Sequence, residues 1–211
     1  KDNCTKKAAA LTVCRKKAAE KLEARICSEL RDLSMPSVRF EVRLLSREGK
    51  NALSASGADE VSFVMSANAG EALGPISRIA SGGELSRIML ALKNVFAEKD
   101  GVDALIFDEI DTGVSGVAAQ RVAEKLASLG RTKQVLCVTH LPQIAAMAQQ
   151  QYLVEKAEHG GRTYTNIRLL DREGRRYELA RLSGGDMITD IQLAGAEELL
   201  ARDERFRASL S

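Results

Sequence analysis

Paired carboxylates follow directly after a short apolar run in the segment 104–113, whose sequence is ALIFDEIDTG. Residues 104–107 are apolar and predict a short buried strand. Asp108 and Glu109 come next, and Asp111 lies two residues further on. At the end of such a strand, one carboxylate can hold Mg²⁺ near phosphates while its neighbour orients a water molecule. A core strand that ends in a solvated acidic turn explains the same residues equally well.

A second segment with chemical potential runs from Ser81 through Gly82 and Gly83 to Glu84, at the start of an expected helix over 84–98. Two glycines let the backbone approach an anion, and a helix N-terminus offers free N–H groups and the positive end of a dipole. The Ser81 hydroxyl adds a donor, so the segment suits a γ-phosphate. The alternative is a plain helix start, with Ser81 as N-cap and Glu84 as its capping-box partner.

The third segment is a buried strand expected over 134–139, which leads directly into His140. A lone histidine at a strand end is more often structural than catalytic. This strand should, however, run parallel to 104–107, and ligands bind at the carboxyl ends of parallel strands. His140 would then share one edge of the sheet with Asp108 and Glu109.

The elements that must position these residues alternate between strand and helix from residue 81 onward. The expected helices and strands are 84–98, 104–107, 116–129, 134–139 and 142–150. This alternation favours a parallel α/β layer. Two further strands are expected at 151–156 and 163–170, and a last helix at about 190–202.

Residues before 81 follow a different pattern. The segment 1–34 predicts one helix, because apolar residues recur at steps of three and four. It is either an ordinary amphipathic helix on a core or the stump of a coiled-coil arm. Pro36 ends it. Alternating apolar residues at 38–44 and 61–65 then predict two antiparallel strands, followed by a loop over 66–80.

Composition excludes several classes of protein. The 211 residues carry a formal net charge of only +2, which does not indicate a nucleic-acid binder. Aromatic residues make up 4% and tryptophan is absent, so a stacking platform for single strands is not expected. No signal peptide or membrane-spanning run is recognised, and the four cysteines lack zinc-type spacing. We expect the cysteines to be free thiols in the cytoplasm. Because the chain starts at lysine and not at methionine, we expect it to be an excised part of a longer protein.

The order of the three segments resembles the C-terminal half of an ABC-type ATPase head. The residues at 79–92, 105–116 and 137–145 are similar to those of the RecN family of SMC-like bacterial DNA repair proteins. The resemblance continues through 179–182 and covers nearly the whole chain. It implies an α/β head lobe with a parallel β-layer flanked by helices and a small antiparallel hairpin. Residues 1–34 would form the coiled-coil stump, and 35–211 the C-terminal half of the head.

The resemblance also implies roles for the residues described above. Segment Ser81–Glu84 matches the signature loop, which in this family contacts the γ-phosphate of ATP bound to the opposite head. Asp108 matches the Walker B acid that holds Mg²⁺, and Glu109 matches the general base. Asp111 matches the D-loop acid at the head–head interface, and His140 matches the switch histidine that senses the γ-phosphate.

One expected motif is missing from the sequence. No G-x-x-x-x-G-K-[ST] phosphate loop occurs, and the nearest segment, 49–51, lacks the first glycine and the hydroxyl. In the family this loop belongs to an N-terminal half separated by the coiled coil. We therefore expect half of an ATPase head, inactive alone, whose partners are that N-terminal half, a second head in a homodimer, and DNA at the nucleoid.

Two other functions remain possible at this point: an ABC transporter nucleotide-binding subunit, and a non-enzymatic structural or DNA-binding module with an inactive head. The segment 182–186, LSGGD, imitates the signature loop. We interpret it as a surface turn before the C-terminal helix, with a phosphate contact as the alternative.

Overall fold

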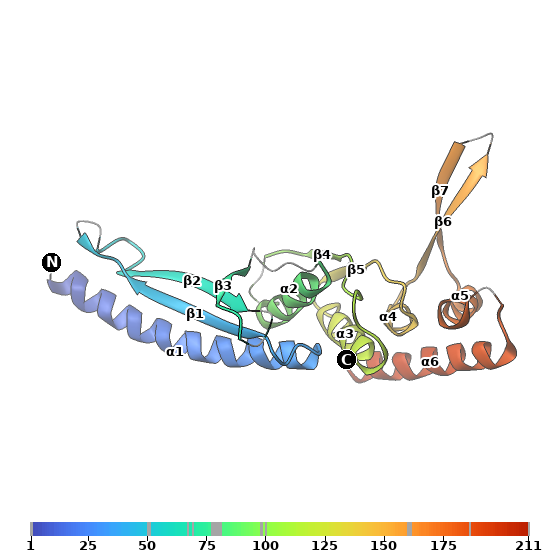
Figure 1. Cartoon of the computed structure of the whole chain (residues 1–211), viewed down its shortest axis with the longest axis horizontal. Coiled ribbons are helices and arrows are strands. Elements are labelled where there is room, and N and C mark those ends of the chain that lie inside the picture. The colour runs from blue at the N-terminus through green and yellow to red at the C-terminus, as the bar shows by residue number, and fades with distance from the viewer. Residues whose placement is uncertain are drawn as a thin grey trace. The chain divides into compact units, whose positions relative to one another are not determined.

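The chain is described here by a computed structural model (Figure 1). It describes residues 2–49, 52–66, 68, 70–76, 82–97, 99, 101–159, 162–185 and 187–210, and only the backbone of residues 159 and 162. The chain forms two compact units, Lys1–Val95 and Phe96–Ser211. The division into an arm of residues 1–34 and a head half of residues 35–211 stays a prediction.

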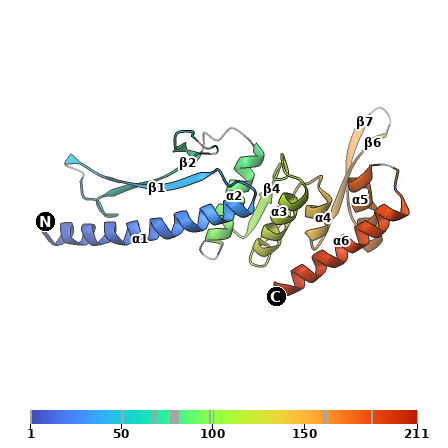
Figure 2. The ribbon, with the colours of Figure 1, turned by 60° about the horizontal axis from the view of Figure 1, so that its bottom comes forward.

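The first unit combines one long helix with a small antiparallel sheet. Its elements are α1 (Asp2–Asp32), β1 (Arg39–Ser46), β2 (Asp59–Ser66), β3 (Gly74–Pro75) and α2 (Gly82–Phe96). Helix α1 runs alongside the β1–β2 hairpin in both ribbon views (Figures 1 and 2). The predicted long helix and antiparallel strand pair are thus confirmed. The predicted loop over 66–80 is partly wrong, because β3 pairs with the end of β2.

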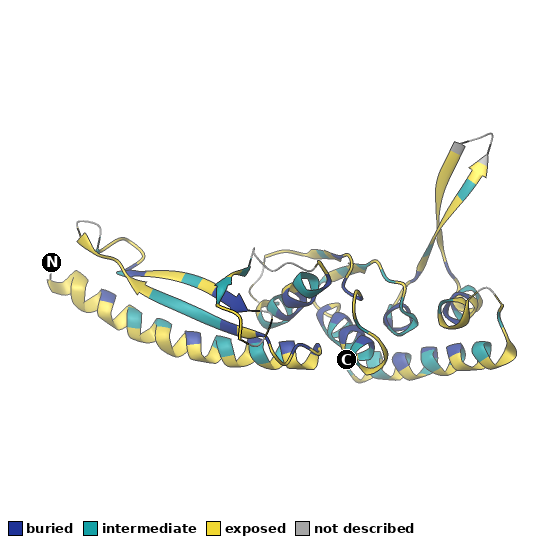
Figure 3. Ribbon diagram, viewed as in Figure 1, coloured by how far each residue is buried: buried dark blue, intermediate teal, exposed yellow. Residues whose placement is uncertain are grey.

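One face of α1 is buried because its small and aliphatic residues recur at helical spacing. Ala8, Ala19, Ile26 and Leu30 are buried, whereas the other faces of the helix are mostly exposed (Figure 3). Such a one-sided pattern is typical of an amphipathic helix packed on a core. Leu33 and Met35, which follow the helix, are also buried.

A polar contact fastens α1 to the hairpin. The Asp59 side chain, at the start of β2, is almost fully buried. It accepts hydrogen bonds from Thr12 Oγ1 at 2.8 and 2.9 Å and from Arg15 Nη1 at 2.9 Å. Arg15 Nη2 also donates to the Ser56 carbonyl oxygen at 2.7 Å. The hydrogen bonds from Arg15 and then Thr12 lower the pKa of Asp59 below its usual value.

Asp59→Asn is expected to lower the thermal unfolding midpoint of the first unit at neutral pH. The pKa of Asp59 is lower in the folded chain, so its ionised form stabilises the fold above the pKa of an unfolded aspartate. That contribution disappears as pH falls through the folded pKa. The difference between wild type and variant should therefore shrink in acid, as followed by circular dichroism. Glu60→Gln, at the exposed neighbouring position, is the matched control. A pH-independent difference would contradict this account.

The second unit carries a short parallel sheet, a long hairpin and four helices. Its elements are β4 (Ala104–Phe107), α3 (Gly116–Leu129), β5 (Gln134–Cys137), α4 (Pro142–Met147), β6 (Tyr152–His159), β7 (Arg162–Leu169), α5 (Arg172–Gly184) and α6 (Asp190–Ser209). Strands β4 and β5 pair in parallel, from Ala104 opposite Gln134 to Phe107 opposite Cys137. Strands β6 and β7 form an antiparallel hairpin. The predicted parallel pairing is confirmed.

Helices α4, α5 and α6 share one apolar core. Its buried members are Ala145, Ala146, Leu179, Ala180, Ala196 and Leu200. The small alanine side chains let the three helix backbones approach closely, and the two leucines fill the space between them. Helix α6 starts with a capping box in which the Thr189 and Gln192 side chains each meet the other residue's backbone N–H.

No helix was predicted from the sequence for the polar residues that form α5. Asp171 caps it by accepting a hydrogen bond from the Gly174 N–H at 2.7 Å. Within the segment 182–186, residues 182–184 end α5, and Gly185 follows with φ of 81°. Most of the α5 surface is polar, and its buried face combines apolar and charged residues. The apolar periodicity that indicates a helix was therefore weak in the sequence. The predicted ends also shifted, since α4 stops at Met147 and α6 reaches Ser209.

All four cysteines are free, as expected. None of the described helices combines the length and apolar character that crossing a membrane requires.

Candidate functional site

The carboxyl ends of β4 and β5 lie side by side. The Val138 N–H donates to the Phe107 carbonyl oxygen at 3.0 Å, which extends the parallel ladder to the last residue of β4. Asp108, which follows β4, and Thr139, two residues after the end of β5, therefore emerge at the same edge. The prediction that 104–107 and the strand before His140 share one edge is confirmed by this pairing. We call the residues Asp108–Asp111 and Thr139–His140 the strand-end cluster.

Asp108 and Glu109 are exposed at this edge. The Glu109 N–H donates to Asp108 Oδ1 at 2.9 Å. Glu109 has φ of 57°, and among the described residues Ser34 is the other non-glycine with positive φ. This left-handed conformation costs roughly 1 kcal/mol for a residue with a Cβ atom. Two features hold the turn in place. The Ile110 side chain is fully buried, and the Thr112 N–H donates to the Glu109 carbonyl oxygen at 3.1 Å.

Asp111 has the opposite environment. It is 4% exposed, and its Oδ2 atom accepts hydrogen bonds from Thr139 Oγ1 at 2.6 Å and the His140 N–H at 2.9 Å. The His140 Nδ1 atom lies 3.0 Å from the same oxygen, while the rest of the histidine side chain is 71% exposed. The carboxylate therefore ties together two segments that are 29 residues apart.

Cys137, the last residue of β5, also belongs to this edge, although sequence reasoning gave it no role. Burial, followed by the negative charges of Asp111 and Asp108, raises the pKa of its thiol to about 12. The thiol is therefore neutral at physiological pH and is not a nucleophile. Its position at the end of a strand before a Thr-His pair was the only available sequence signal.

The predicted anion-binding segment lies in the first unit. Gly82, Gly83 and Glu84 form the first turn of α2, and Ser81 lies outside the described residues. One turn further on, Arg87 is 7% exposed. Burial lowers the pKa of its guanidinium, while the charge of Glu84 acts in the other direction. Sequence reasoning missed this buried arginine, whose signal was a cation within the apolar stripe of the helix.

The parallel sheet leaves one apolar face open within the described residues. Ile106, Leu136 and Val138 are 76%, 48% and 63% exposed. Ile106 and Leu136 are paired across the two strands, so their side chains point to the same side. Parallel strands are normally covered on both faces, so an open face of this kind is unusual for a parallel sheet. The hairpin β6–β7 also has an exposed apolar face, formed by Tyr152, Val154, Ile167 and Leu169.

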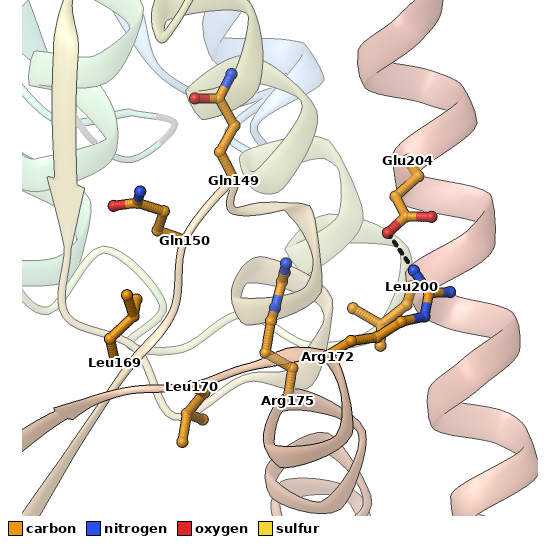
Figure 4. Close-up of a pocket in the computed structure, with 8 residues that line it drawn as sticks. All are labelled: Gln149, Gln150, Leu169, Leu170, Arg172, Arg175, Leu200 and Glu204. Carbon is orange, nitrogen blue, oxygen red and sulfur yellow. Dashed lines mark hydrogen bonds and ion pairs between the residues drawn. The ribbon is translucent and has the colours of Figure 1, made fainter.

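A cavity of about 240 Å³ lies beside α5 and α6 (Figure 4). It is lined by Gln149, Gln150, Leu169, Leu170, Arg172, Arg175, Leu200 and Glu204. Arg172 is engaged with Glu204 at 2.9 Å and Glu197 at 2.6 Å. The cavity shares no residue with the strand-end cluster, so we assign it no part in the candidate chemistry. Among the described residues there is no group of three or more metal-ligating side chains.

Solved structures define the class of fold. The Smc head domain with a coiled coil and joint derived from Pyrococcus yayanosii superposes with a TM-score of 0.53 at 19% identity, over 81% of this chain and 30% of that one. The Smc head domain from Pyrococcus furiosus, solved with the C-terminal domain of ScpA, gives 0.50 at 18%, over 81% and 39%. The chain therefore has the fold of one lobe of an ABC-type ATPase head of the SMC kind, as expected.

Sequence comparison identifies the family within this class. The chain is 46% identical to the DNA repair protein RecN of Halalkalibacterium halodurans over 91% of its length, and 44% identical to that of Treponema pallidum over 94%. It covers 34% and 35% of those two proteins. The RecN of Bacillus subtilis is 40% identical over 96% of the chain. No family model matches. The chain belongs to the RecN family and spans about a third of the length of these relatives.

Proposed function

We propose that the complete protein is an ATPase that acts in DNA double-strand break repair, and that this chain supplies the C-terminal lobe of its head. The observation that supports this most directly is the strand-end cluster, where two exposed carboxylates and a histidine gather at one edge of a parallel sheet. Under this proposal residues 1–34 are the base of a coiled-coil arm. The related proteins are DNA repair proteins, which favours neither a transporter subunit nor an inactive module.

The residues present fit a nucleotide with Mg²⁺. Asp108 is an exposed carboxylate, and Mg²⁺ is typically bound by one or two carboxylates together with water and substrate phosphates. A cluster of three protein ligands is therefore not required. We assign Asp108 to the metal. The chemistry that Mg²⁺ supplies in such sites is neutralisation of charge on phosphate oxygens.

The other residues of the cluster receive complementary roles. We assign Glu109 as the general base, because its strained turn holds the carboxylate in solvent next to the proposed metal ligand. His140 would contact the γ-phosphate through its exposed ring. Segment Ser81–Glu84 would contact the γ-phosphate of ATP bound to an opposite head. Asp111 would lie near the interface between the heads, as the family resemblance implies.

The proposed partners follow from what the chain lacks. Its sequence has no phosphate loop, so an N-terminal lobe must supply one. The open face of the β4–β5 sheet, with Ile106, Leu136 and Val138, is a suitable place for that lobe to pack. A second copy of the head would complete the site, and DNA would be the substrate of the assembled protein. We place this activity in the cytoplasm, at the nucleoid.

The 211-residue chain alone is expected to show no measurable ATP turnover. The reason is the missing phosphate loop, without which the β- and γ-phosphates have no cradle. Adding the N-terminal lobe of the same protein, as a separate polypeptide, should restore turnover in a steady-state phosphate-release assay. The proposal is wrong if the chain alone hydrolyses ATP in a way that Glu109→Gln abolishes, or if a folded mixture of both lobes stays inactive.

A further inference from the structure

A single buried oxygen atom in the strand-end cluster accepts two hydrogen bonds and also faces a ring nitrogen of His140. Asp111 Oδ2 lies 2.6 Å from Thr139 Oγ1, 2.9 Å from the His140 backbone nitrogen and 3.0 Å from His140 Nδ1. The residue is 4% exposed. A carboxylate with this burial and these partners is committed to its own lobe, which does not favour direct contact with a second head.

We propose that Asp111 is a positioning residue that holds the His140 ring with its proton on Nδ1 and its Nε2 atom facing solvent. This inference rests on the proposed function, in which the exposed ring edge meets the γ-phosphate or the water near it. Asp111 acts through His140, and it does not itself reach the nucleotide.

The chemistry of the two groups determines the tautomer. An ionised carboxylate can only accept hydrogen bonds, so the ring nitrogen that faces it must carry a hydrogen. In a neutral imidazole the other nitrogen is then an acceptor. Since Nδ1 faces Asp111, Nε2 becomes the acceptor in the neutral ring and the free donor in the protonated ring. A carboxylate that orients a histidine in this way is a recurrent device in hydrolytic sites.

The remaining contacts of Asp111 make this arrangement rigid. The same oxygen accepts from the backbone of His140 and from the side chain of Thr139. Thr139 Oγ1 accepts in turn from the Leu141 N–H at 3.0 Å. The segment on both sides of the ring is therefore held together with the ring itself. A preorganised ring needs no rearrangement when charge develops nearby, which is the main benefit of such positioning.

The tautomer can be measured directly by ¹⁵N NMR on the intact chain. The sequence contains two histidines, so His159→Gln leaves His140 as the only imidazole signal. At alkaline pH, where imidazole is neutral, we expect Nδ1 to be protonated and Nε2 to be unprotonated. Asp111→Ala removes the oxygen that faces Nδ1, so the ring should lose its preference for a proton on Nδ1 and the tautomer should shift towards a proton on Nε2. A wild-type ring with its proton on Nε2 would overturn the proposal, even if the variant does not fold.

A control variant distinguishes an effect on the orientation of the His140 ring from an effect on the stability of the fold. Thr139→Val removes one donor to Asp111 but leaves the contact between carboxylate and ring. It should lower the unfolding midpoint without changing the tautomer. If Asp111→Ala also changed only the midpoint, Asp111 would have a purely structural role and the inference would be wrong.

The consequence for turnover is tested in the head completed with the N-terminal lobe. Asp111→Ala should lower kcat on the order of 10²-fold with little change in KM, because the ring is no longer held with Nε2 as its acceptor. An unchanged kcat would count against the positioning role. An inactive wild-type head with the expected tautomer would instead reject the proposed function and leave the assignment of the ring intact.

Discussion

Glu109→Gln is expected to reduce ATP turnover of the head completed with the N-terminal lobe by about 10²–10⁴-fold, the usual contribution of a general base. The amide has almost the same size as the carboxylate but cannot accept a proton from water. Nucleotide binding should persist, because the proposed metal ligand, Asp108, is unchanged. Single-turnover kinetics together with a fluorescent-nucleotide titration would separate the two effects.

The strained backbone at Glu109 makes a matched control necessary. Glutamine keeps the Cβ atom and the positive φ of 57°, so Glu109→Gln should not change the stability of the chain. Asp103→Asn removes an exposed carboxylate just before β4, at the opposite end of the strand, and should leave turnover unchanged. Wild-type turnover in Glu109→Gln would show that another group activates the water.

Arg175→Met is expected to destabilise the second unit by about 3 kcal/mol, because buried acceptors lose a charged donor. Arg175 is 9% exposed, and its Nη2 atom donates to the carbonyl oxygens of Ala146 at 3.1 Å and Ala148 at 2.8 Å, at the end of α4. Burial and the charge of Arg207 lower the pKa of this guanidinium, so its placement already carries a desolvation cost. Urea denaturation followed by circular dichroism would measure the change.

Two comparisons make the Arg175 experiment specific. Arg205→Ala removes an exposed arginine on α6 and should leave the stability of the chain nearly unchanged. Arg207 Nη1 also donates to the Ala146 and Met147 carbonyl oxygens, at 3.2 and 3.0 Å, so Arg207→Met should destabilise in the same direction. Amide hydrogen exchange should increase at α4 in both methionine variants. Unchanged exchange there would show that the arginines do not hold this helix.

The C-terminal helices show where sequence reasoning was least informative. No helix was predicted for the α5 segment, where charged residues such as Arg175 and Glu178 interrupt the apolar pattern. In the structure these two side chains are buried, and Arg175 binds backbone carbonyl groups instead of water. Because a buried cation and an exposed one look identical in a sequence, the period of the helix was hidden.

In the strand-end cluster, too, some features were predicted from the sequence and others were not. Local patterns predicted the apolar strands, the parallel pairing of β4 with β5 and the common edge of Asp108, Glu109 and His140. Those features depend on side-chain period and chain order, which a sequence contains. The αL turn at Glu109 and the neutral thiol of Cys137 were not predicted, because they depend on burial and on neighbours from other segments.

The sequence by itself determined the family resemblance, the long N-terminal helix and the order of the chemically capable residues, since each is written in a short stretch of chain. Only the tertiary structure decided that Asp111 turns inward while Asp108 and Glu109, three and two residues before it, remain in solvent. The physical reason is that Thr139 and His140 reach Asp111 from the segment after β5, which is distant in the sequence. Their donors make burial of that one carboxylate favourable, and no local pattern distinguishes it from its neighbours.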